Sequence, residues 1–141
     1  MRLCAGRKVF VPCIKLEEIP SPGSATSRVA GGIAICIAVD RFGSIFALAD
    51  KCPPADKRLS LGAVDDDGTI EDPAFGTKFS LRTGEVVGPW CPAGFGFVGR
   101  IFPQAGVSTF PLRQKGRYLL VQIDAAKEND AGFTYEQSEI I

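Results

Sequence analysis

Short apolar segments separated by turn-forming residues make up most of this sequence, and this alternation limits the fold more than any other feature. The chain has 16 Gly and 10 Pro among 141 residues, and many of them stand between the apolar segments. Frequent turn residues around short apolar runs are typical of an antiparallel β-protein. A chain of this length forms one domain with a core of its own. We therefore predict an all-β domain over residues 1–124, followed by a polar tail at 125–141.

The apolar runs place the expected strands. A strand at 8–14 is followed by a short helical turn at 15–19, and residues 27–39 contain a second strand with a turn or bulge at Gly31-Gly32. The turn at Asp40–Gly43 joins this strand to the next one in a hairpin. The remaining strands are expected at 44–48, 69–71, 78–81, 85–87, 110–112 and 117–123.

The charged residues and the missing histidines exclude several classes of protein. The 16 basic and 16 acidic residues give a net charge of zero, whereas a nucleic-acid-binding protein is expected to have a basic excess. The chain contains no His, which removes His-based acid–base catalysis, His-activated nucleophiles and His metal ligands. We therefore predict that the protein does not bind nucleic acid and does not use His-based catalysis.

The five cysteines do not form a recognisable framework. Their number is odd, no Cys-x-x-Cys pair occurs, and neither a disulfide-rich scaffold nor a zinc site is indicated. Cys36 stands in an apolar run and is expected to be buried. A disulfide between Cys52 and Cys91, or between Cys4 and Cys13, is an alternative that the sequence leaves undecided.

Two loops carry the most specific spacing in the chain. The first contains Cys52 and Pro54, and the second contains Asp72 and Phe75 followed by Gly76. Seventeen residues separate Pro54 from Asp72. The residues that frame the two loops are Leu59, Ser60, Gly62, Phe79, Leu81, Thr83, Gly84 and Glu85.

This arrangement resembles a Rieske [2Fe–2S] domain over residues 8–123. Such a cluster is held by two Cys and two His, in a Cys-x-His loop and a Cys-x-x-His loop. Cys52 and Asp72 take the two Cys positions, and Pro54 and Phe75 take the two His positions. The resemblance implies an antiparallel β-sandwich with a small, former cluster-binding subdomain at 48–87. Because three ligand positions are changed, we expect neither a 2Fe-2S cluster nor any other metal or cofactor.

The residues that replace the ligands suggest structural roles. Pro54 would stiffen the first loop by restricting the unfolded chain. Phe75 would fill the space of an imidazole and a cluster, with a gain of about 1.5–3 kcal/mol on full burial. Asp72 would accept hydrogen bonds from backbone amides that face the cluster in the family.

The segment 89–110 is an aromatic and glycine-rich insertion with one charged residue, Arg100. It either covers the core of its own domain or docks to another protein. Exposed apolar surface generally marks a partner, and aromatic residues are enriched at interfaces. The residues expected to bind a partner are Trp90, Phe95, Phe97, Ile101 and Phe102.

Two runs, KVFVPCIKLEEIP at 8–20 and FSLRTGEVV at 79–87, are similar to those of chloroplast photosystem-associated Rieske-like proteins. The resemblance implies a non-catalytic structural or assembly subunit that docks to photosystem core or light-harvesting subunits on the stromal side of the thylakoid membrane. No apolar run reaches the roughly 20 residues of a membrane-spanning helix, so any membrane attachment would be peripheral. The alternatives are an electron-transfer ferredoxin or reductase small subunit, and a regulatory module that works through the thiol of Cys52 or Cys91.

Overall fold

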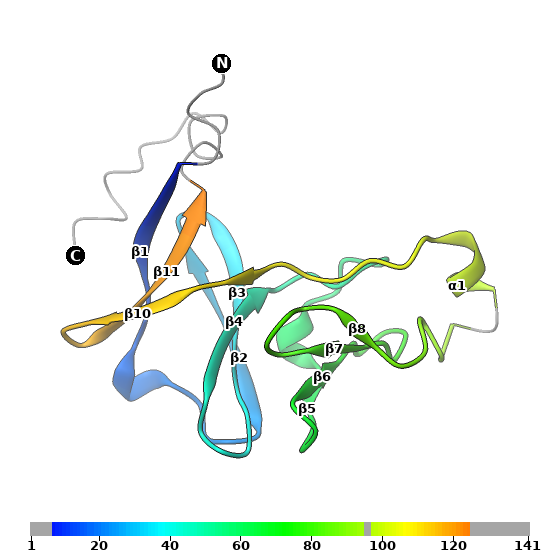
Figure 1. Ribbon diagram of the computed structural model, residues 1–141, viewed down its shortest axis with the longest axis horizontal. Coiled ribbons are helices and arrows are strands. Elements are labelled where there is room, and N and C mark those ends of the chain that lie inside the picture. Colours follow the sequence, from blue (N-terminus) through cyan, green and yellow to red (C-terminus); the bar gives the residue numbers. More distant parts are fainter. Residues whose placement is uncertain (1–6, 95–96, 125–141) are drawn as a thin grey trace.

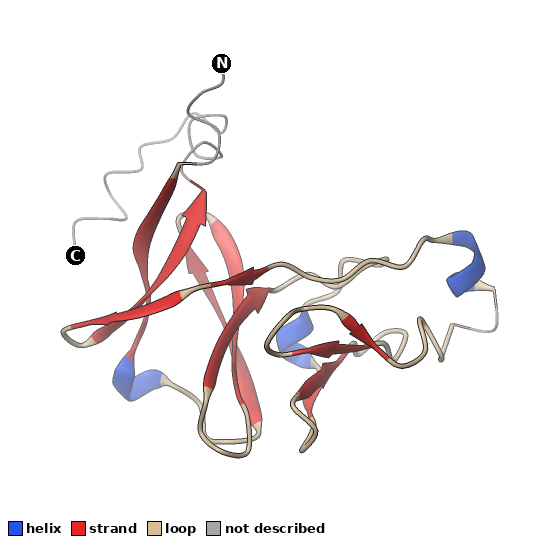
Figure 2. Ribbon diagram, viewed as in Figure 1, coloured by secondary structure: helices blue, strands red, loops and turns tan. Residues whose placement is uncertain are grey.

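The computed structural model describes residues 7–94 and 97–124, which form three antiparallel sheets and little helix (Figures 1 and 2). The strands are β1 (Lys8–Lys15), β2 (Ser24–Ala30), β3 (Ile33–Val39), β4 (Ile45–Ala49), β5 (Ala63–Val64), β6 (Thr69–Glu71), β7 (Lys78–Ser80), β8 (Val86–Val87), β9 (Thr109–Phe110), β10 (Leu112–Lys115) and β11 (Tyr118–Asp124). The helical elements are the 3-10 turns η1 (Leu16–Glu18) and η2 (Leu59–Leu61) and the single-turn helix α1 (Val98–Ile101).

Two of the sheets form the base of the domain. One has the strand order β1-β11-β10 and the other has the order β2-β3-β4-β9. A shared core lies between them, to which β11 contributes Leu119, Val121 and Ile123 and β3 contributes Ile35 and Ile37. The alternation of apolar residues along β11 therefore marks a strand with one buried face. The predicted all-β sandwich is confirmed.

Strand β3 is apolar along its whole length because both of its faces are covered. Ile35 and Ile37 belong to the core between the base sheets, whereas Cys36 and Ala38 belong to a second core under the small sheet. Successive side chains of a strand point to opposite faces, so a strand inside two cores reads as a continuous apolar run. Cys36 is fully buried, as predicted.

The small sheet β5-β6-β7-β8 lies within the 48–87 range and packs on the second core. Leu59, Phe79 and Leu81, which frame the two loops in the sequence, are buried in this core. Gly62 is required by close packing, since a Cβ atom there would collide with the carbonyl oxygen of Glu71. The framing residues thus build the small sheet and its contact with the base.

The structure divides two of the expected strands. Residues 27–39 fall into two paired strands, β2 and β3, because Gly31 and Gly32 adopt positive φ angles of 57° and 79° and reverse the chain. The expected strand at 110–112 is also divided, because Phe110 ends β9 in one base sheet and Leu112 begins β10 in the other. Pro111, between them, has no N–H to donate to a ladder.

A buried carboxylate joins the base to the first loop. The side chain of Asp50, at the end of β4, accepts hydrogen bonds from Ser27 Oγ at 2.6 Å and from Ser60 N and Oγ at 2.6 and 2.8 Å. Arg58 Nε lies 3.5 Å from the same carboxylate. Buried charges are costly unless they are paired and hydrogen-bonded, so this set of donors stabilises Asp50 in the interior. Nothing in the sequence pattern pointed to Asp50.

Within residues 7–94 and 97–124, no helix reaches the length and hydropathy that a membrane span requires.

Replacing Asp50 with Ala should lower the free energy of unfolding by about 2–4 kcal/mol, because Ser27, Ser60 and Arg58 lose a shared buried acceptor. Urea unfolding followed by far-UV circular dichroism measures this loss. Asp66→Ala, in an exposed turn, is the matched control and should change stability by less than about 0.5 kcal/mol. Equal unfolding midpoints for the two variants would contradict the assigned role of Asp50.

Candidate functional site

The first loop is a tight turn around Cys52. The backbone N–H of Cys52 donates to the carbonyl of Lys57 at 2.9 Å, and the N–H of Asp56 donates to the carbonyl of Cys52 at 2.8 Å. The Cys52 thiol also donates to the Lys57 carbonyl at 3.1 Å. Pro54 follows a cis peptide bond and is half-buried. Cys52, with 1% of its surface exposed, is therefore fixed at the base of the loop.

The second loop is organised by Asp72, which is 2% exposed. Its carboxylate accepts hydrogen bonds from the backbone N–H of Ala74 at 2.8 Å and of Phe75 at 3.3 Å. The carbonyl of Asp72 accepts from Gly76 N at 3.0 Å, and Gly76 has a φ of 76° that closes the turn. The structure agrees with the interpretation that Asp72 bonds backbone amides of this loop.

A side-chain hydrogen bond joins the two loops. Asp72 Oδ1 lies 3.3 Å from the Cys52 sulfur, across 20 residues of sequence, and shares the single S–H proton with the Lys57 carbonyl as a second acceptor. Burial raises the pKa of the Cys52 thiol well above its ordinary value, and the charge and hydrogen bond of Asp72 raise it further. A nucleophilic or redox-sensing thiol needs a lowered pKa and access to solvent. The environment of Cys52 is therefore the opposite of what the thiol-regulation alternative requires.

The other described cysteines are also free thiols, so the alternative disulfide between Cys52 and Cys91 is wrong. Burial raises the pKa of Cys13 to about 11, while the Arg28 charge opposes the shift. Burial and the charge of Asp50 raise the pKa of Cys36 to about 12. The proposed partner of Cys13, Cys4, lies outside the described residues.

The insertion at 89–110 begins against the second loop. The carbonyl of Phe75 accepts a hydrogen bond from Ala93 N at 2.9 Å, and the buried hydroxyl of Thr77 accepts from Cys91 N at 2.9 Å. Phe75 itself is half-buried, so it gains less than the full-burial value expected for it. Thr77, which is 0% exposed, was missed by sequence reasoning because a single Thr in a loop carries no spacing signal.

The returning part of the insertion is fixed to the β7–β8 turn. Val107 N donates to the carbonyl of Gly84 at 2.8 Å, and a Cβ atom at Gly84, where φ is 77°, would collide with the carbonyl of Val107. Val107 is buried in the second core. The indole N–H of Trp90 donates to the carbonyl of Phe102 at 3.0 Å and so joins the two ends of the segment that carries α1.

Between these fixed points the insertion presents apolar side chains to solvent. Phe97, Ile101 and Phe102 are 48%, 62% and 44% exposed, whereas Val98 on the same helical turn is buried. Figure 1 shows α1 at the end of the molecule farthest from β1 and β10. Trp90 is half-buried, and Phe95 lies outside the described residues. The insertion thus covers part of its own core and leaves an apolar surface, the α1 patch, formed by Phe97, Ile101 and Phe102.

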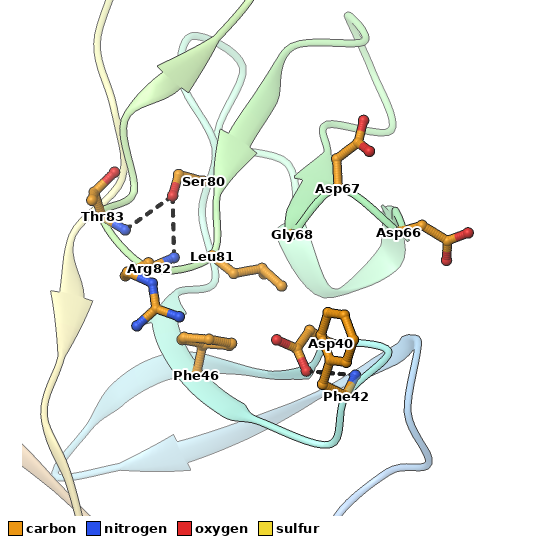
Figure 3. Close-up of a pocket in the computed structure, with 10 residues that line it drawn as sticks. All are labelled: Asp40, Phe42, Phe46, Asp66, Asp67, Gly68, Ser80, Leu81, Arg82 and Thr83. Carbon is orange, nitrogen blue, oxygen red and sulfur yellow. Dashed lines mark hydrogen bonds between the residues drawn. The ribbon is translucent and has the colours of Figure 1, made fainter.

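A shallow cavity of about 330 Å³ lies elsewhere, between the β3–β4 turn and the small sheet (Figure 3). Asp40 in its wall accepts hydrogen bonds from Phe42 N at 2.9 Å and Ser44 N at 2.8 Å. The Arg82 guanidinium lies 5.4 Å from the centre of the Phe46 ring. Asp66 and Asp67 point away from the cavity in Figure 3. Asp40 and Ser80 accept hydrogen bonds within their own turns and the Arg82 guanidinium lies over Phe46, so we do not place the functional site here.

The comparison with known proteins identifies the family. The model of the Rieske-like [2Fe-2S] domain family matches residues 9–122. The chain belongs to this family. One curated relative is the 3-phenylpropionate/cinnamic acid dioxygenase ferredoxin subunit of Photorhabdus laumondii, 31% identical over 72 residues. The match spans 51% of this chain and 66% of that relative, slightly under two thirds of its length.

Solved structures of ferredoxins share the fold of this Rieske-like domain. The ferredoxin of carbazole 1,9a-dioxygenase from Nocardioides aromaticivorans IC177 has a TM-score of 0.64 at 22% identity, over 80% of this chain and 96% of that chain. A chain of the complex of reduced oxygenase and oxidized ferredoxin in carbazole 1,9a-dioxygenase has a TM-score of 0.58 at 20% identity, over 77% and 98%. At these identities the likeness establishes the fold alone.

Family membership corrects the expectation of no cofactor. That expectation is wrong, because the family is one of [2Fe-2S] domains and a relative of this chain is a dioxygenase ferredoxin subunit. The residues at the four ligand positions do not fit such a cluster in its two-Cys, two-His form. The side chains of Pro54 and Phe75 have no atom that can bind iron, and the Cys52 thiol is hydrogen-bonded to Asp72. Among the described residues, no group of three or more His, Cys, Asp or Glu side chains is placed to hold a metal ion.

The contact between Cys52 and Asp72 can be measured with a double-mutant cycle of Cys52→Ala and Asp72→Asn. Each loop needs this contact to hold its position against the other, so we expect a coupling free energy of about 1 kcal/mol. Urea unfolding of the wild type, both single variants and the double variant gives the value. Strictly additive effects would show that the two loops are held together by something else.

The thiol pKa values predict loss of stability at alkaline pH. A thiol whose pKa is raised by folding keeps its proton in the folded state, whereas the unfolded thiol loses it above the ordinary value of 9.0. Stability is therefore fully present below pH 9 and falls as the pH rises toward the folded value of about 12 for Cys36. Between about pH 8 and about pH 10.5, the wild type should lose about 2 kcal/mol more than Cys36→Ala. Parallel pH profiles of the two proteins would contradict this assignment.

Proposed function

We propose that this protein is a small, non-catalytic subunit that binds a larger protein partner through the α1 patch. The observation that carries the proposal is the exposure of Phe97, Ile101 and Phe102 on a segment whose only charge is Arg100. Exposed apolar clusters on soluble domains generally mark interaction sites, and Phe is enriched at the centres of interfaces.

The hydrogen bonds of the insertion support a preformed surface. Trp90 is bonded to Phe102, Val107 is bonded to Gly84, and Ala93 is bonded to Phe75. A segment that is already ordered loses less conformational freedom when a partner binds. Relatives in multi-component systems agree with a subunit role, since the curated relative is a subunit of a dioxygenase and the second structure is a complex of oxygenase with ferredoxin.

Electron transfer is the second candidate function. Membership of a [2Fe-2S] family and the ferredoxin relatives favour it. The residues of this chain that occupy the ligand positions offer one thiol and one carboxylate, Cys52 and Asp72, which are bonded to each other. Iron and sulfide analysis of the natively isolated protein, together with its absorption spectrum in both redox states, separates this candidate from a purely structural subunit.

The identity of the partner is a further part of the proposal. A photosystem core or light-harvesting subunit is proposed as the partner on the similarity of runs 8–20 and 79–87 alone. The protein would then be attached peripherally, on the stromal side of a chloroplast thylakoid membrane. The ferredoxin relatives support an oxygenase or reductase as the partner instead. Identification of the chains that remain bound after native isolation distinguishes the two.

Replacing Phe97 and Ile101 with Glu should abolish co-purification of the partner, because two charges in the α1 patch cannot be desolvated at an apolar interface. The measurement is affinity isolation from the native source followed by identification of bound chains, with circular dichroism to verify folding. Phe42→Glu is the matched control, since Phe42 is 75% exposed on the distant β3–β4 turn. Loss of the partner in the control, retention in the patch variant, or migration of the wild type as a free monomer would overturn the proposal.

A further inference from the structure

The outer face of the β1-β11-β10 sheet has an unusual combination of charge and apolar surface. Its other face forms the core with the second base sheet, so the residues that alternate with the buried ones point outward. Strand pairing places Tyr118 beside Lys15 and Lys115, and Leu120 beside Pro12 and Arg113.

The charged residues of this sheet and its turn are strongly unbalanced. Strands β1, β10 and β11 with the turn between the last two contain the five basic residues Lys8, Lys15, Arg113, Lys115 and Arg117 and one acidic residue, Asp124. Within the described ranges, none of Lys8, Lys15 and Lys115 forms an ion pair.

One of the cations on this face is held in place by an aromatic ring. The Arg113 guanidinium lies 4.0 Å from the centre of the Phe10 ring, although β11 separates their strands. A stacked guanidinium keeps donor groups for a carboxylate at little further cost in side-chain freedom. The face therefore offers oriented cations beside the half-exposed apolar side chains Phe10, Tyr118 and Leu120.

The chain that follows this sheet has the complementary composition. Residues 125–141 lie outside the described residues and contain four acidic residues and one basic residue, together with the apolar side chains Phe133, Tyr135, Ile140 and Ile141. They continue directly from Asp124, the last residue of the central strand β11. Seventeen residues can span about 55 Å when extended, roughly twice the length of a seven-residue strand such as β11.

We propose that the outer face of the β1-β11-β10 sheet is the docking site for this chain's own acidic C-terminal segment, residues 125–141. Charge complementarity, apolar complementarity and the attachment point all favour this occupant. Because the segment is tethered at the edge of the site, its effective concentration is about millimolar, so a weak contact is enough to keep the face covered. The face lies away from the α1 patch (Figure 1), so this inference is independent of the proposed function.

The contact is expected to depend on salt because it joins charges of opposite sign. Exposed ion pairs weaken as salt rises, and an acidic partner of higher charge can displace the segment.

The test compares the full-length wild type with a full-length variant in which the four tail carboxylates become amides, by Glu128→Gln, Asp130→Asn, Glu136→Gln and Glu139→Gln. Amide nitrogen–proton spectra report on every backbone N–H of both. Outside the substituted segment 125–141, we expect chemical-shift differences confined to β1, β10 and β11, and the same differences on these strands in the wild type when salt rises from about 0.05 to about 0.5 M. Unchanged signals on these strands in both experiments would overturn the proposal.

A reciprocal variant changes the face and leaves the segment intact. Arg113→Glu with Lys115→Glu, two exposed positions, should shift the amide signals of residues 125–141, whereas Arg41→Glu on the β3–β4 turn should leave them unchanged. Addition of a synthetic peptide of residues 125–141 to the amide-tail variant should bring back the wild-type signals of the face, and binding should be about tenfold weaker at the higher salt.

Other occupants of the face are distinguished in the same experiments. A membrane surface would replace the segment as the occupant if two results were obtained together. The wild type would sediment with vesicles of anionic phospholipid and the face variant would not, and the tail variant would show unchanged signals on the face. A concentration-dependent dimer that is lost in the face variant would overturn it in favour of a second copy of the chain.

Discussion

The hydrogen bond from the Cys52 thiol to Asp72 holds together the two loops on which the small sheet depends. Each loop is a tight turn that fixes its own residue, Cys52 through the Lys57 carbonyl and Asp72 through the amides of Ala74 and Phe75. The side chains therefore meet with little freedom left to lose. The sequence resemblance assigns Cys52 and Asp72 to two cluster-ligand positions, and the structure places these two side chains in contact.

Asp50 makes the second connection, between the base of the domain and the first loop. It draws its hydrogen-bond donors from β2 and from residues near η2, so one buried carboxylate fixes the distance between two structural layers. The insertion is then attached to the second loop, because its backbone N–H groups donate hydrogen bonds to Phe75 and Thr77. The position of the α1 patch thus follows from contacts that begin at the two loops.

The sequence predicted the regular part of the fold well because apolar runs and turn residues report local geometry. The continuous run in β3, the hairpin at Asp40–Gly43 and the framing residues of the small sheet all carry such signals. Asp50 and Thr77 could not be found in this way, since their importance arises from donors distant in the chain. The loop spacing identified the family, but the inference from lost ligands to an absent cofactor went beyond what that spacing can establish, and family membership contradicts it.

The uneven distribution of charge has a consequence that the zero net charge conceals. Five basic residues gather on one sheet and its turn, while the remaining described chain, residue 7 with 16–94 and 97–111, contains nine basic and eleven acidic residues. Separated charges of opposite sign give the folded domain an electric dipole. The field of a charged surface exerts a torque on such a dipole and turns the molecule during the approach. The protein would therefore arrive at an acidic or basic surface in a preferred orientation before any side chain makes contact.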